Sequence, residues 1–536
     1  MGAVLGFYAE GRLARMDGEN AVAYEESKTS LNRREALRLG AAGVFALAMP
    51  GVVTSARAAS QAGAAAGKAG GQLIIAASGN SGDSLDPNTL TYSSTRINQI
   101  CETLTQQSTD PRGYDFVVAE EVTMENPSRW VIRLRKGITF HDGRPVTVDD
   151  LIYTITNALK SPGSTNGTLL NAVDLAGLKK LDERTLQFDL KRPDSMLDLV
   201  LWRLFIVPQD FDKTNPIGTG PFKFKSFTPG SRSEFVRNEN YWKEGKPLLD
   251  SLVTLSIQDP SAQVNGLLAG QADVVTRLDT RLLALVERKP GFQVSEYTSS
   301  VTLQINMNTA IKPLGDVRVR QALKMLMDRE AIAKQAFSGH ASVANDVFAP
   351  LDPYHDSSIK PLPYDPDKAK ALLKEADALR AEFVIDTNNG FPNQVNLANV
   401  IGQQWKAQGL NVTVRNLDEA TFYGPEYKTR QLSSSYWPGH TMSSLILLSR
   451  LPESPFNATG WTDPDFTRIF EQARAEASRE KRQELMSELQ RIEVERGPEL
   501  IPVYPKAIDA SSPHVAGMTE QAFTLRPDYA SLQRVD

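Results

Sequence analysis

The sequence predicts a mixed α/β fold, because short strand patterns and amphipathic helix patterns alternate along both halves of the chain. In the first half, Leu73-Ile74-Ile75-Ala76 is typical of a buried strand. In the second half, strand patterns at residues 381–385 and 410–414 lie between helix patterns. At roughly 150 residues per domain, a chain of 536 residues is long enough for two or three domains with cores of their own.

Residues 130–134 also have a strand pattern, in which Trp, Ile and Leu alternate with Val and Arg. This alternation indicates a half-buried strand with one charged face. His141-Asp142-Gly143 then supplies turn residues, and Thr147 with Asp150 resembles a capping box that starts a helix. A catalytic His-Asp pair is disfavoured, since adjacent turn residues point apart and no third partner is indicated. The segment is therefore interpreted as strand, turn and helix.

Gly218-Thr219-Gly220-Pro221-Phe222 superficially resembles a nucleotide-binding loop. However, the third glycine of a G-x-G-x-x-G loop is missing, and no G-K-S or G-K-T sequence occurs in the chain. Phe222 and Phe224 alternate with lysines, and Thr228-Pro229-Gly230 turns the chain back. These residues predict a β-hairpin instead of a phosphate site.

Three helices are predicted in the second half. Asp316 is expected to cap the first, whose apolar residues form one buried stripe while basic residues such as Arg320 and Lys324 stay solvated. Asp365-Pro366 is expected to cap and open the second. The third is expected to run from Phe466 to Glu495, a segment without Pro or Gly. Its pattern favours a surface helix with one face in the core over a coiled coil.

The N-terminal region is predicted to be an export signal. Arg33-Arg34 precedes a modestly apolar run, and Ala56-Arg57-Ala58 fits a signal-peptidase site. Residues 1–58 would then be a signal peptide with Met16 as an alternative start, and residues 59–71, rich in Ala and Gly, a flexible linker. A membrane anchor is disfavoured, because the run falls short of about 18 clean apolar residues. The twin-arginine and general secretory routes both stay open.

Composition argues against several functions. The net charge of -5 provides no basic field, so we expect no nucleic-acid binding. Beyond residue 59 no apolar stretch approaches membrane-spanning length. Cys101 is the only cysteine, so no intramolecular disulfide can form. The five histidines are dispersed, and we expect neither a bound metal nor a cofactor.

The order of motifs resembles the family 5 solute-binding proteins of ABC importers, which include periplasmic dipeptide, oligopeptide and nickel receptors. The resemblance extends from about residue 72 to the C-terminus. It depends on seven segments in order: Leu85-Asp86-Pro87; Leu134 to Leu151, with its F-H-D-G sequence; Gly218 to Phe222; Asn240 to Pro247; Gly270-Gln271-Ala272-Asp273; Asp316 to Ala322 with Asp328-Arg329; and Tyr364 to Ala369.

The resemblance implies a two-lobed periplasmic binding protein fold of type II-like topology, with a hinge, a ligand cleft between the lobes and an extra small domain. Lobe I would comprise residues 72–110, 216–300 and 505–536, the small domain residues 111–215, and lobe II residues 301–504. The protein would be a monomer in the periplasm of a Gram-negative bacterium, and not an enzyme. Its partners would be a small solute and the permease subunits of an ABC importer.

The resemblance also suggests which residues bind the ligand, and none of them is catalytic. They come from the loop after Leu85-Asp86-Pro87 and from loops of lobe II across the cleft. Aromatic rings there would give rigid contact area, and Asn, Ser or Thr side chains would give oriented hydrogen bonds. The candidates are Tyr92, Ser93, Asn388, Asn389, Phe391, Tyr436, Trp437, His440, Thr441, Asn457 and Trp461.

One departure from the family pattern affects the ligand. Peptide-binding members have an aspartate after the tryptophan of this region, but here no acidic residue occurs between Glu426 and Glu453. A buried ammonium without a partner is costly, so a hydroxyl-rich ligand such as an opine-like sugar-amino acid conjugate is favoured. Di- and oligopeptides and, through His440, a nickel chelate stay alternatives. An exported hydrolase is the alternative of another class, although G-x-S-x-G and H-E-x-x-H are absent.

Overall fold

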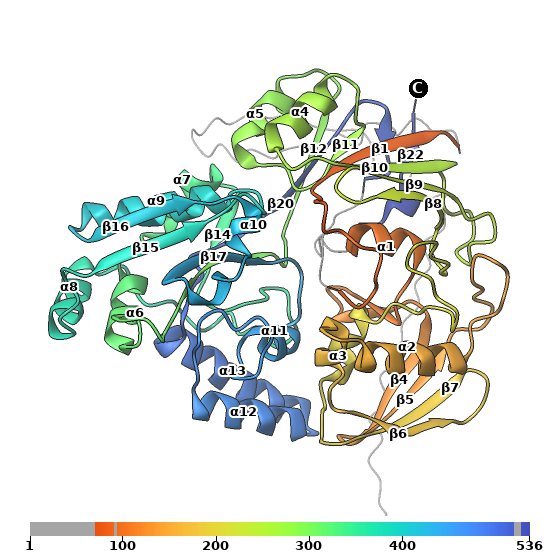
Figure 1. Cartoon of the computed structure of the whole chain (residues 1–536), viewed down its shortest axis with the longest axis horizontal. Coiled ribbons are helices and arrows are strands. Elements are labelled where there is room, and N and C mark those ends of the chain that lie inside the picture. Colours follow the sequence, from red (N-terminus) through yellow and green to blue (C-terminus); the bar gives the residue numbers. More distant parts are fainter. Residues whose placement is uncertain (1–69, 90–93, 519–526, 536) are drawn as a thin grey trace, which may run out of the picture. The chain divides into compact units, whose positions relative to one another are not determined.

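The computed structural model describes residues 70–89, 94–518 and 527–535 (Figure 1). These residues belong to one compact unit that spans residues 63–536. The predicted signal peptide, its twin arginines and most of the predicted linker lie outside the described residues, as do Tyr92 and Ser93. No helix in the described part of the chain has the length and apolar character needed to cross a membrane.

A mixed sheet of seven strands contains strands from both the beginning and the end of the described chain. Its order is β12-β20-β11-β1-β10-β9-β8. β1 runs parallel to β10 and β11, and β8 pairs with β9 as the predicted hairpin. The strands are β1 (Gln72–Ala77), β8 (Phe222–Thr228), β9 (Arg232–Arg237), β10 (Ser251–Ser256), β11 (Val274–Val275), β12 (Gln293–Tyr297) and β20 (Ala507–Ser511). The accompanying helices are α1 (Ser94–Ile100), α4 (Pro260–Leu268), η2 (Thr280–Leu282) and α5 (Leu283–Glu287).

A second sheet of five strands is formed by the second half of the chain. Its order is β16-β15-β17-β13-β18, with β15 parallel to β16 and β17. The helix α9 (Gln394–Ala407) packs on this sheet through Trp405, whose ring lies 6.2 Å from that of Phe383. The strands are β13 (Thr302–Met307), β15 (Glu382–Thr387), β16 (Asn411–Asn416), β17 (Leu432–Trp437) and β18 (Glu499–Leu500), and they include both predicted strands.

A third, antiparallel sheet has the order β4-β5-β7-β6. β5 is the strand predicted from the alternation at residues 130–134. The predicted capping box is present at the start of the next helix, where the Thr147 amide donates to the Asp150 carboxylate at 2.9 Å. The elements are β4 (Ala119–Asn126), β5 (Arg129–Leu134), α2 (Val148–Lys160), α3 (Thr165–Leu169), β6 (Val173–Lys180), β7 (Thr185–Leu190) and η1 (Leu197–Arg203).

The F-H-D-G and G-T-G-P-F segments contact each other. The His141 amide donates to the Gly218 carbonyl at 2.9 Å, and the His141 ring lies between the Gly218 amide and the Gly220 carbonyl. Burial lowers the pKa of His141 to about 4, so the ring is neutral at pH 7. A Cβ on Gly218 would lie 2.2 Å from the Ile100 carbonyl oxygen, so the glycine permits a close approach to α1. Both segments therefore have a structural role.

The helices at Asp316 and Asp365 form as predicted, as α6 (Val317–Met325) and α8 (Pro366–Glu375). However, Arg320 and Lys324 are not solvated. Lys324 is 1 % exposed, and its Nζ donates to the carbonyls of Glu493 and Val494 at 2.6 and 3.1 Å. Arg320 donates to the Arg496 carbonyl at 2.8 Å. The prediction was wrong because a second helix end packs here, whose last carbonyls need donors.

The predicted helix from Phe466 to Glu495 is two helices, α12 (Pro464–Ala475) and α13 (Arg479–Arg496). Ser478 caps α13 by accepting from the Lys481 amide. Arg482 donates to the carbonyls of Glu476 and Ala477 at 2.6 and 2.9 Å, which compensates the interrupted ladder. The break is produced by a serine cap and an arginine side chain, so no Pro or Gly marks it in the sequence. α12 still faces the core as expected, with Phe466 and Phe470 buried.

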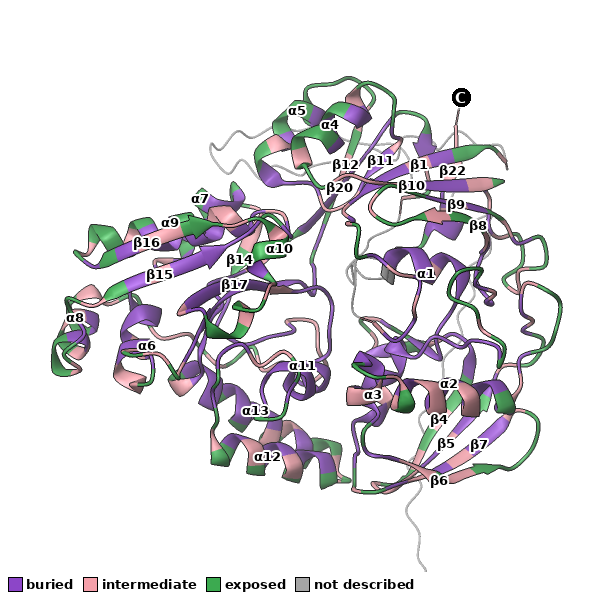
Figure 2. Ribbon diagram, in the orientation of Figure 1, coloured by how far each residue is buried: buried purple, intermediate pink, exposed green. Residues whose placement is uncertain are grey.

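One apolar core joins the third sheet to helices from the end of the chain. It includes Trp130 and Ile132 of β5 together with Leu445, Phe470 and Leu489. Figure 2 shows that α11 (Met442–Ser449) is buried along its length, whereas α12 is exposed on one side. The other described elements are β2 (Thr105–Gln107), β3 (Tyr114–Phe116), α7 (Arg329–Phe337), β14 (Ala341–Val343), α10 (Glu419–Phe422), η3 (Tyr427–Thr429), β19 (Val503–Pro505), β21 (Val515–Ala516), η4 (Tyr529–Ser531) and β22 (Gln533–Arg534).

The chain passes between the seven-stranded and five-stranded sheets at two adjacent places. The first connects β12, which ends at Tyr297, to β13, which begins at Thr302. The second runs from β18 of the five-stranded sheet through β19, which pairs with β14 and ends at Pro505, to β20, which begins at Ala507. Because Tyr297 pairs with Ala507 in the sheet, the two connections lie side by side.

Candidate functional site

The main cavity, of about 460 Å³, lies where loops of the seven-stranded and five-stranded sheets meet. β1 ends at Ala77 and β17 at Trp437, and residues just beyond the carboxyl ends of strands form part of its wall. Ligands commonly bind at this edge of α/β sheets. From the seven-stranded sheet side the lining residues are Asn80, Asp83, Thr95 and Arg277. From the five-stranded sheet side they include Tyr423, Tyr427, Tyr436, Trp437 and Phe456.

The loop after β1 is held by local hydrogen bonds. The Asn80 amide donates to the Asp83 carboxylate at 3.2 Å, and the Asn80 side chain accepts from the Gly82 amide at 2.9 Å. Asp83 is buried and lies 3.6 Å from the Arg96 guanidinium. Burial lowers the pKa of Arg96, although the Asp83 carboxylate opposes this shift. The loop thus presents a fixed amide and a carboxylate that already has a counter-ion.

Arg277, just after β11, is the arginine that lines the main cavity. Its backbone has a φ of 57°, in the left-handed region that non-glycine residues seldom adopt. The Asp509 carboxylate stabilises this conformation by accepting from the Arg277 amide at 2.8 Å. The guanidinium lies 5.7 Å from the centre of the Phe391 ring. A positive charge is therefore held at the edge of the cavity.

Aromatic rings dominate the opposite wall. Tyr423 and Tyr427 lie 5.3 Å apart at 46°, and Trp437 meets Phe456 edge to face at 6.0 Å. Tyr423 is 42 % exposed. It lies in a concave surface where protein replaces much of the bulk water, and this desolvation raises its pKa. These rings offer broad and rigid contact area at a small entropic cost.

Glu419, at the start of α10, links the two sides of the site. Its carboxylate accepts from Asn80 at 3.5 Å and from Gln258 at 3.4 Å, both of which follow strands of the seven-stranded sheet. It also lines a side cavity of about 190 Å³. The side cavity has no aromatic or basic residue in its wall, which comprises Ser78, Gly79, Gln258, Asn389, Gly390, Leu417, Asp418 and Glu419. Such a wall suits hydroxyl groups, to which amides donate and from which carboxylates accept.

Comparison with known proteins identifies the class of this site. Residues 116–451 match the middle part of the bacterial extracellular solute-binding proteins, family 5. The chain belongs to this family. It is thus a non-enzymatic solute-binding protein of an ABC importer, and the two cavities lie between its two larger sheets, where a solute can be enclosed.

Relatives of this solute-binding protein have different ligands in their names. A di/tripeptide-binding protein of Pseudomonas aeruginosa is 27 % identical over 72 % of this chain and 80 % of its own. The dipeptide-binding protein of Escherichia coli is 26 % identical over 73 % and 81 %. The structure of AgaA in complex with agropinic acid, from A. tumefaciens R10, has a TM-score of 0.75 with 21 % identity and covers 87 % of this chain and 99 % of its own. The last likeness shows the shared fold.

The structure places four of the predicted ligand residues at these cavities or close to them. Tyr436 and Trp437 line the main cavity, and Asn389 lines the side cavity. Phe391 packs against Tyr436, with ring centres 4.8 Å apart. Asn388, directly before Asn389, is fully buried, and its side chain accepts from the Gly390 amide at 2.7 Å. Some residues of this loop therefore line a cavity, and others pack against the residues that line it.

His440 and Thr441 lie deeper in the protein. His440 is 2 % exposed and is packed edge-on against Trp202 and Trp437 at 5.3 and 5.2 Å. Burial lowers its pKa to about 3, so the imidazole is neutral. Thr441 caps α11 and donates from its hydroxyl to the Leu199 carbonyl at 3.1 Å. In the described part of the chain, no group of three or more His, Cys, Asp or Glu side chains is placed to hold a metal ion.

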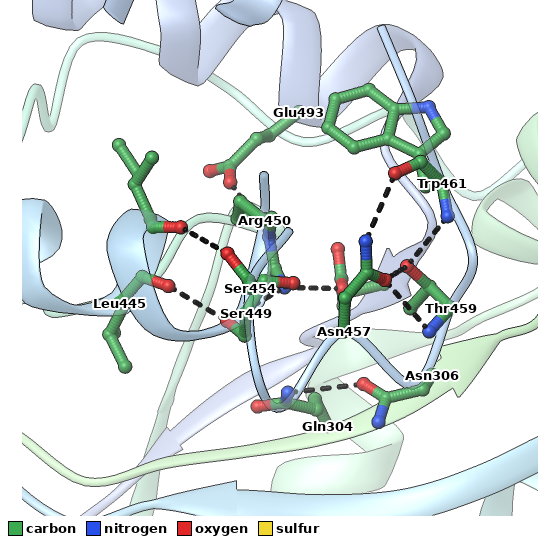
Figure 3. Close-up of polar contacts among 12 residues, drawn as sticks. Gln304, Asn306, Leu445, Ser449, Arg450, Ser454, Asn457, Thr459, Trp461 and Glu493 are labelled. Atoms are coloured by element: carbon green, nitrogen blue, oxygen red, sulfur yellow. Dashed lines mark hydrogen bonds and ion pairs between the residues drawn. The ribbon is translucent and has the colours of Figure 1, made fainter. Parts of the chain in front are cut away.

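Asn457 and Trp461 lie in a turn that is held by its own hydrogen bonds (Figure 3). The Asn457 side chain accepts from the Thr459 amide and hydroxyl at 3.2 and 2.8 Å, and donates to the Trp461 carbonyl at 3.2 Å. Trp461 is 4 % exposed and packs against Phe466. Neither residue lines the main or side cavity. Phe456, one residue before Asn457, does line the main cavity.

Several cavity residues were missed in the sequence. A polar, Gly-containing loop after the first strand was detectable, and it contains Asn80 and Asp83. Glu419 lies before the segment from Glu426 to Glu453, where the family pattern places an acidic residue, so that pattern does not predict it. No local signal distinguishes Arg277, because its role depends on which ring and which carboxylate lie beside it. Tyr423 and Tyr427 resemble core aromatics in sequence.

Proposed function

We propose that this protein captures a small polar solute between two lobes by hinge closure and delivers it to the permease subunits of an ABC importer in the inner membrane. The lobes would have the boundaries predicted above, with lobe I at residues 72–110, 216–300 and 505–536, a small domain at 111–215 and lobe II at 301–504. The two adjacent connections near Tyr297 and Lys506 support this hinge. Closure would be favoured by a ligand that contacts both sides at once.

The proposed ligand is an opine-like conjugate of a sugar and an amino acid. The observation that supports it is the division of the site at Glu419. On one side is a cavity with aromatic rings and the Arg277 cation, and on the other a smaller cavity with only hydroxyl, amide and carboxylate groups and one aliphatic side chain. A ligand with a polyol part and a charged amino acid part would match both cavities.

Titration calorimetry with two matched sets of compounds tests this proposal. The first set contains hexitol conjugates of amino acids, and the second contains dipeptides with the same amino acids. Binding of a conjugate at least tenfold tighter than the corresponding dipeptide is expected. Tight binding confined to dipeptides would overturn the proposed ligand class and leave the receptor function intact. The bound compound should be recovered chemically unchanged, whereas turnover would indicate the hydrolase alternative.

Glu419 favours peptides as the second candidate ligand. Its carboxylate lines the main cavity, so an acidic group that could receive an ammonium is present after all. The absence of acidic residues between Glu426 and Glu453 is therefore a weaker argument against peptide ligands than the sequence alone suggested. The amine of a sugar-amino acid conjugate would bind the same carboxylate as the amine of a peptide. The calorimetry therefore has to show whether the hydroxyl-rich part of the conjugate adds affinity. A nickel chelate has less support, because His440 does not line either cavity.

The predicted export signal, with either secretion route, and a periplasmic location in a Gram-negative bacterium complete this proposal. Determination of the mature N-terminus by mass spectrometry tests them together. A mature chain that begins near Ala59 is expected. A mature N-terminus within residues 1–30 would contradict both the signal peptide and the cleavage site.

A further inference from the structure

Arg277 differs in its surroundings from several other buried or half-buried arginines of the protein. Arg96 lies beside Asp83, Arg430 beside Asp386 and Arg474 beside Asp194. For Arg277, no carboxylate of residues 70–89, 94–518 or 527–535 lies within ion-pair distance, and its guanidinium makes no hydrogen bond with these residues. A half-buried cation without an ion-pair partner is costly unless something else compensates it.

The nearby Asp509 carboxylate is already used in another way. One of its oxygens accepts from the Arg277 backbone amide at 2.8 Å, and the other accepts from the Tyr297 hydroxyl at 2.5 Å. Asp509 therefore fixes the main chain of Arg277 in its left-handed conformation, with φ at 57°. Backbone conformations of this kind cost energy and persist where the surrounding structure enforces them, often at ligand sites.

The aromatic neighbours of Arg277 come from the other side of the site. The guanidinium lies over Phe391, and Phe391 packs against Tyr436, which lines the main cavity. Stacking of this kind holds the guanidinium plane but uses none of its five N–H donors. These donors match a planar carboxylate, which they can bind through two parallel hydrogen bonds. A carboxylate bound here would also lie beside the rings of the opposite wall.

We infer that Arg277 is the residue that binds a carboxylate of the ligand and selects for anionic ligands at this end of the main cavity. This inference rests on the proposed function, since it assigns one part of the proposed ligand to one residue. It commits the ligand to a free carboxylate at the end of its amino acid part. Asp509 is then a positioning residue, which acts on the ligand only through the main chain of Arg277.

Calorimetry with two pairs of probes tests this assignment. The first pair is the hexitol conjugate of glutamine with its α-carboxylate free or converted to the carboxamide, and the second is Ala-Phe and Ala-Phe amide. The proteins are wild type, Arg277→Met, Arg277→Lys and Arg288→Met. The last removes an exposed arginine from the nearby α5 region and is the matched control.

Wild type and Arg288→Met are expected to bind the acid of at least one pair about 100-fold tighter than the amide, since bidentate charged contacts of this kind are strong. Arg277→Met should reduce the preference to within threefold, and Arg277→Lys should retain part of it, because an ammonium keeps the charge but not the planar pair of donors. The melting temperature without ligand verifies that each variant is folded.

Two outcomes would overturn the inference in distinguishable ways. If wild type binds acid and amide equally, or if Arg277→Met keeps the full preference, Arg277 does not bind the ligand carboxylate. The proposed receptor function and ligand class are unaffected by that result. If wild type binds none of the four probes, the proposed ligand class fails together with this assignment. Arg277→Lys decides the result should Arg277→Met not fold.

Discussion

The region around Arg450 and the main cavity around Arg277 both contain charged side chains, but their charges are balanced differently. Arg450 is 3 % exposed and lies 3.2 Å from Glu493 (Figure 3) and 2.7 Å from Glu499, so protein groups neutralise it. Arg277 has no such partner among the described residues. One arginine therefore stabilises the fold, whereas the other is left for a ligand. Substitution of each should affect different measurements.

Arg450→Met should have the largest effect, on stability. Removal of the guanidinium leaves Glu493 and Glu499 buried without their ion-pair partner, and breaking a buried pair in this way costs about 3–5 kcal/mol. Urea denaturation at pH 7.5 measures the change in the free energy of unfolding. Arg491→Met, which removes an exposed arginine beside Glu488, is the control and should change it by less than about 0.5 kcal/mol. Equal effects of the two variants would contradict the proposed difference between buried and exposed pairs.

Glu499→Gln should change how stability depends on pH. Burial raises the pKa of Glu499 to about 7 from its ordinary value of 4.5. The folded protein thus holds this proton more tightly than the unfolded chain, so the resulting stability is fully present below pH 4.5 and is lost as the pH rises through 7. Between pH 4.5 and 7.5, the free energy of unfolding of the variant should therefore rise by about 2–3 kcal/mol relative to that of wild type.

The control for this titration is Glu488→Gln, which removes a half-exposed carboxylate. Denaturation curves at pH 4.5, 6 and 7.5 give the free energy of unfolding for wild type and both variants. The Glu488 variant should keep the slope of wild type. Parallel pH profiles for wild type and Glu499→Gln would show that Glu499 titrates normally in the folded protein.

On the cavity side of the comparison, Tyr423→Ala should weaken ligand binding without destabilising the protein. The ring is 42 % exposed in the wall of the main cavity, and a lost aromatic contact costs about 1–1.5 kcal/mol, or about tenfold in affinity. Calorimetry with the hexitol-glutamine conjugate measures the effect. Tyr364→Ala, at a ring that is 49 % exposed and lines neither cavity, should leave affinity unchanged. A loss of affinity in both variants would point to a general effect on folding.

The smallest effect is expected for Lys428→Met. Lys428 also lines the main cavity, but its side chain is exposed, so water and salt screen its charge. The affinity for the same conjugate should fall by about twofold to threefold at low salt, corresponding to at most about 0.6 kcal/mol. The difference should vanish at 0.5 M salt, where the Debye length is roughly 4 Å, compared with about 30 Å at 0.01 M. An effect as large as that of Arg277→Met would mean that Lys428 is the anion site.

Sequence patterns were reliable where neighbours along the chain produce the structure. Thr147 and Asp150 form a capping box, and the hairpin of β8 and β9 follows from alternation and a turn. The patterns failed where a distant segment intervenes. Lys324 was expected in solvent, but the end of α13 lies against it, and a serine cap divides the long helix before Arg479. Pairing between segments far apart in sequence leaves no local signal.

The sequence by itself determined the α/β class, most strands and helix starts, and the order of motifs that resembles the family. These depend on side-chain periodicity, caps and turns, which act over a few residues. Only the tertiary structure decided which polar residues are satisfied by the protein. It held Asn457 in a turn by hydrogen bonds, packed His440 between two indoles, and placed Arg277 at a cavity with a ring beneath it. A charged side chain is available to a ligand when folding brings neither an ion-pair partner nor a hydrogen-bond acceptor to it, and that depends on its three-dimensional neighbours alone.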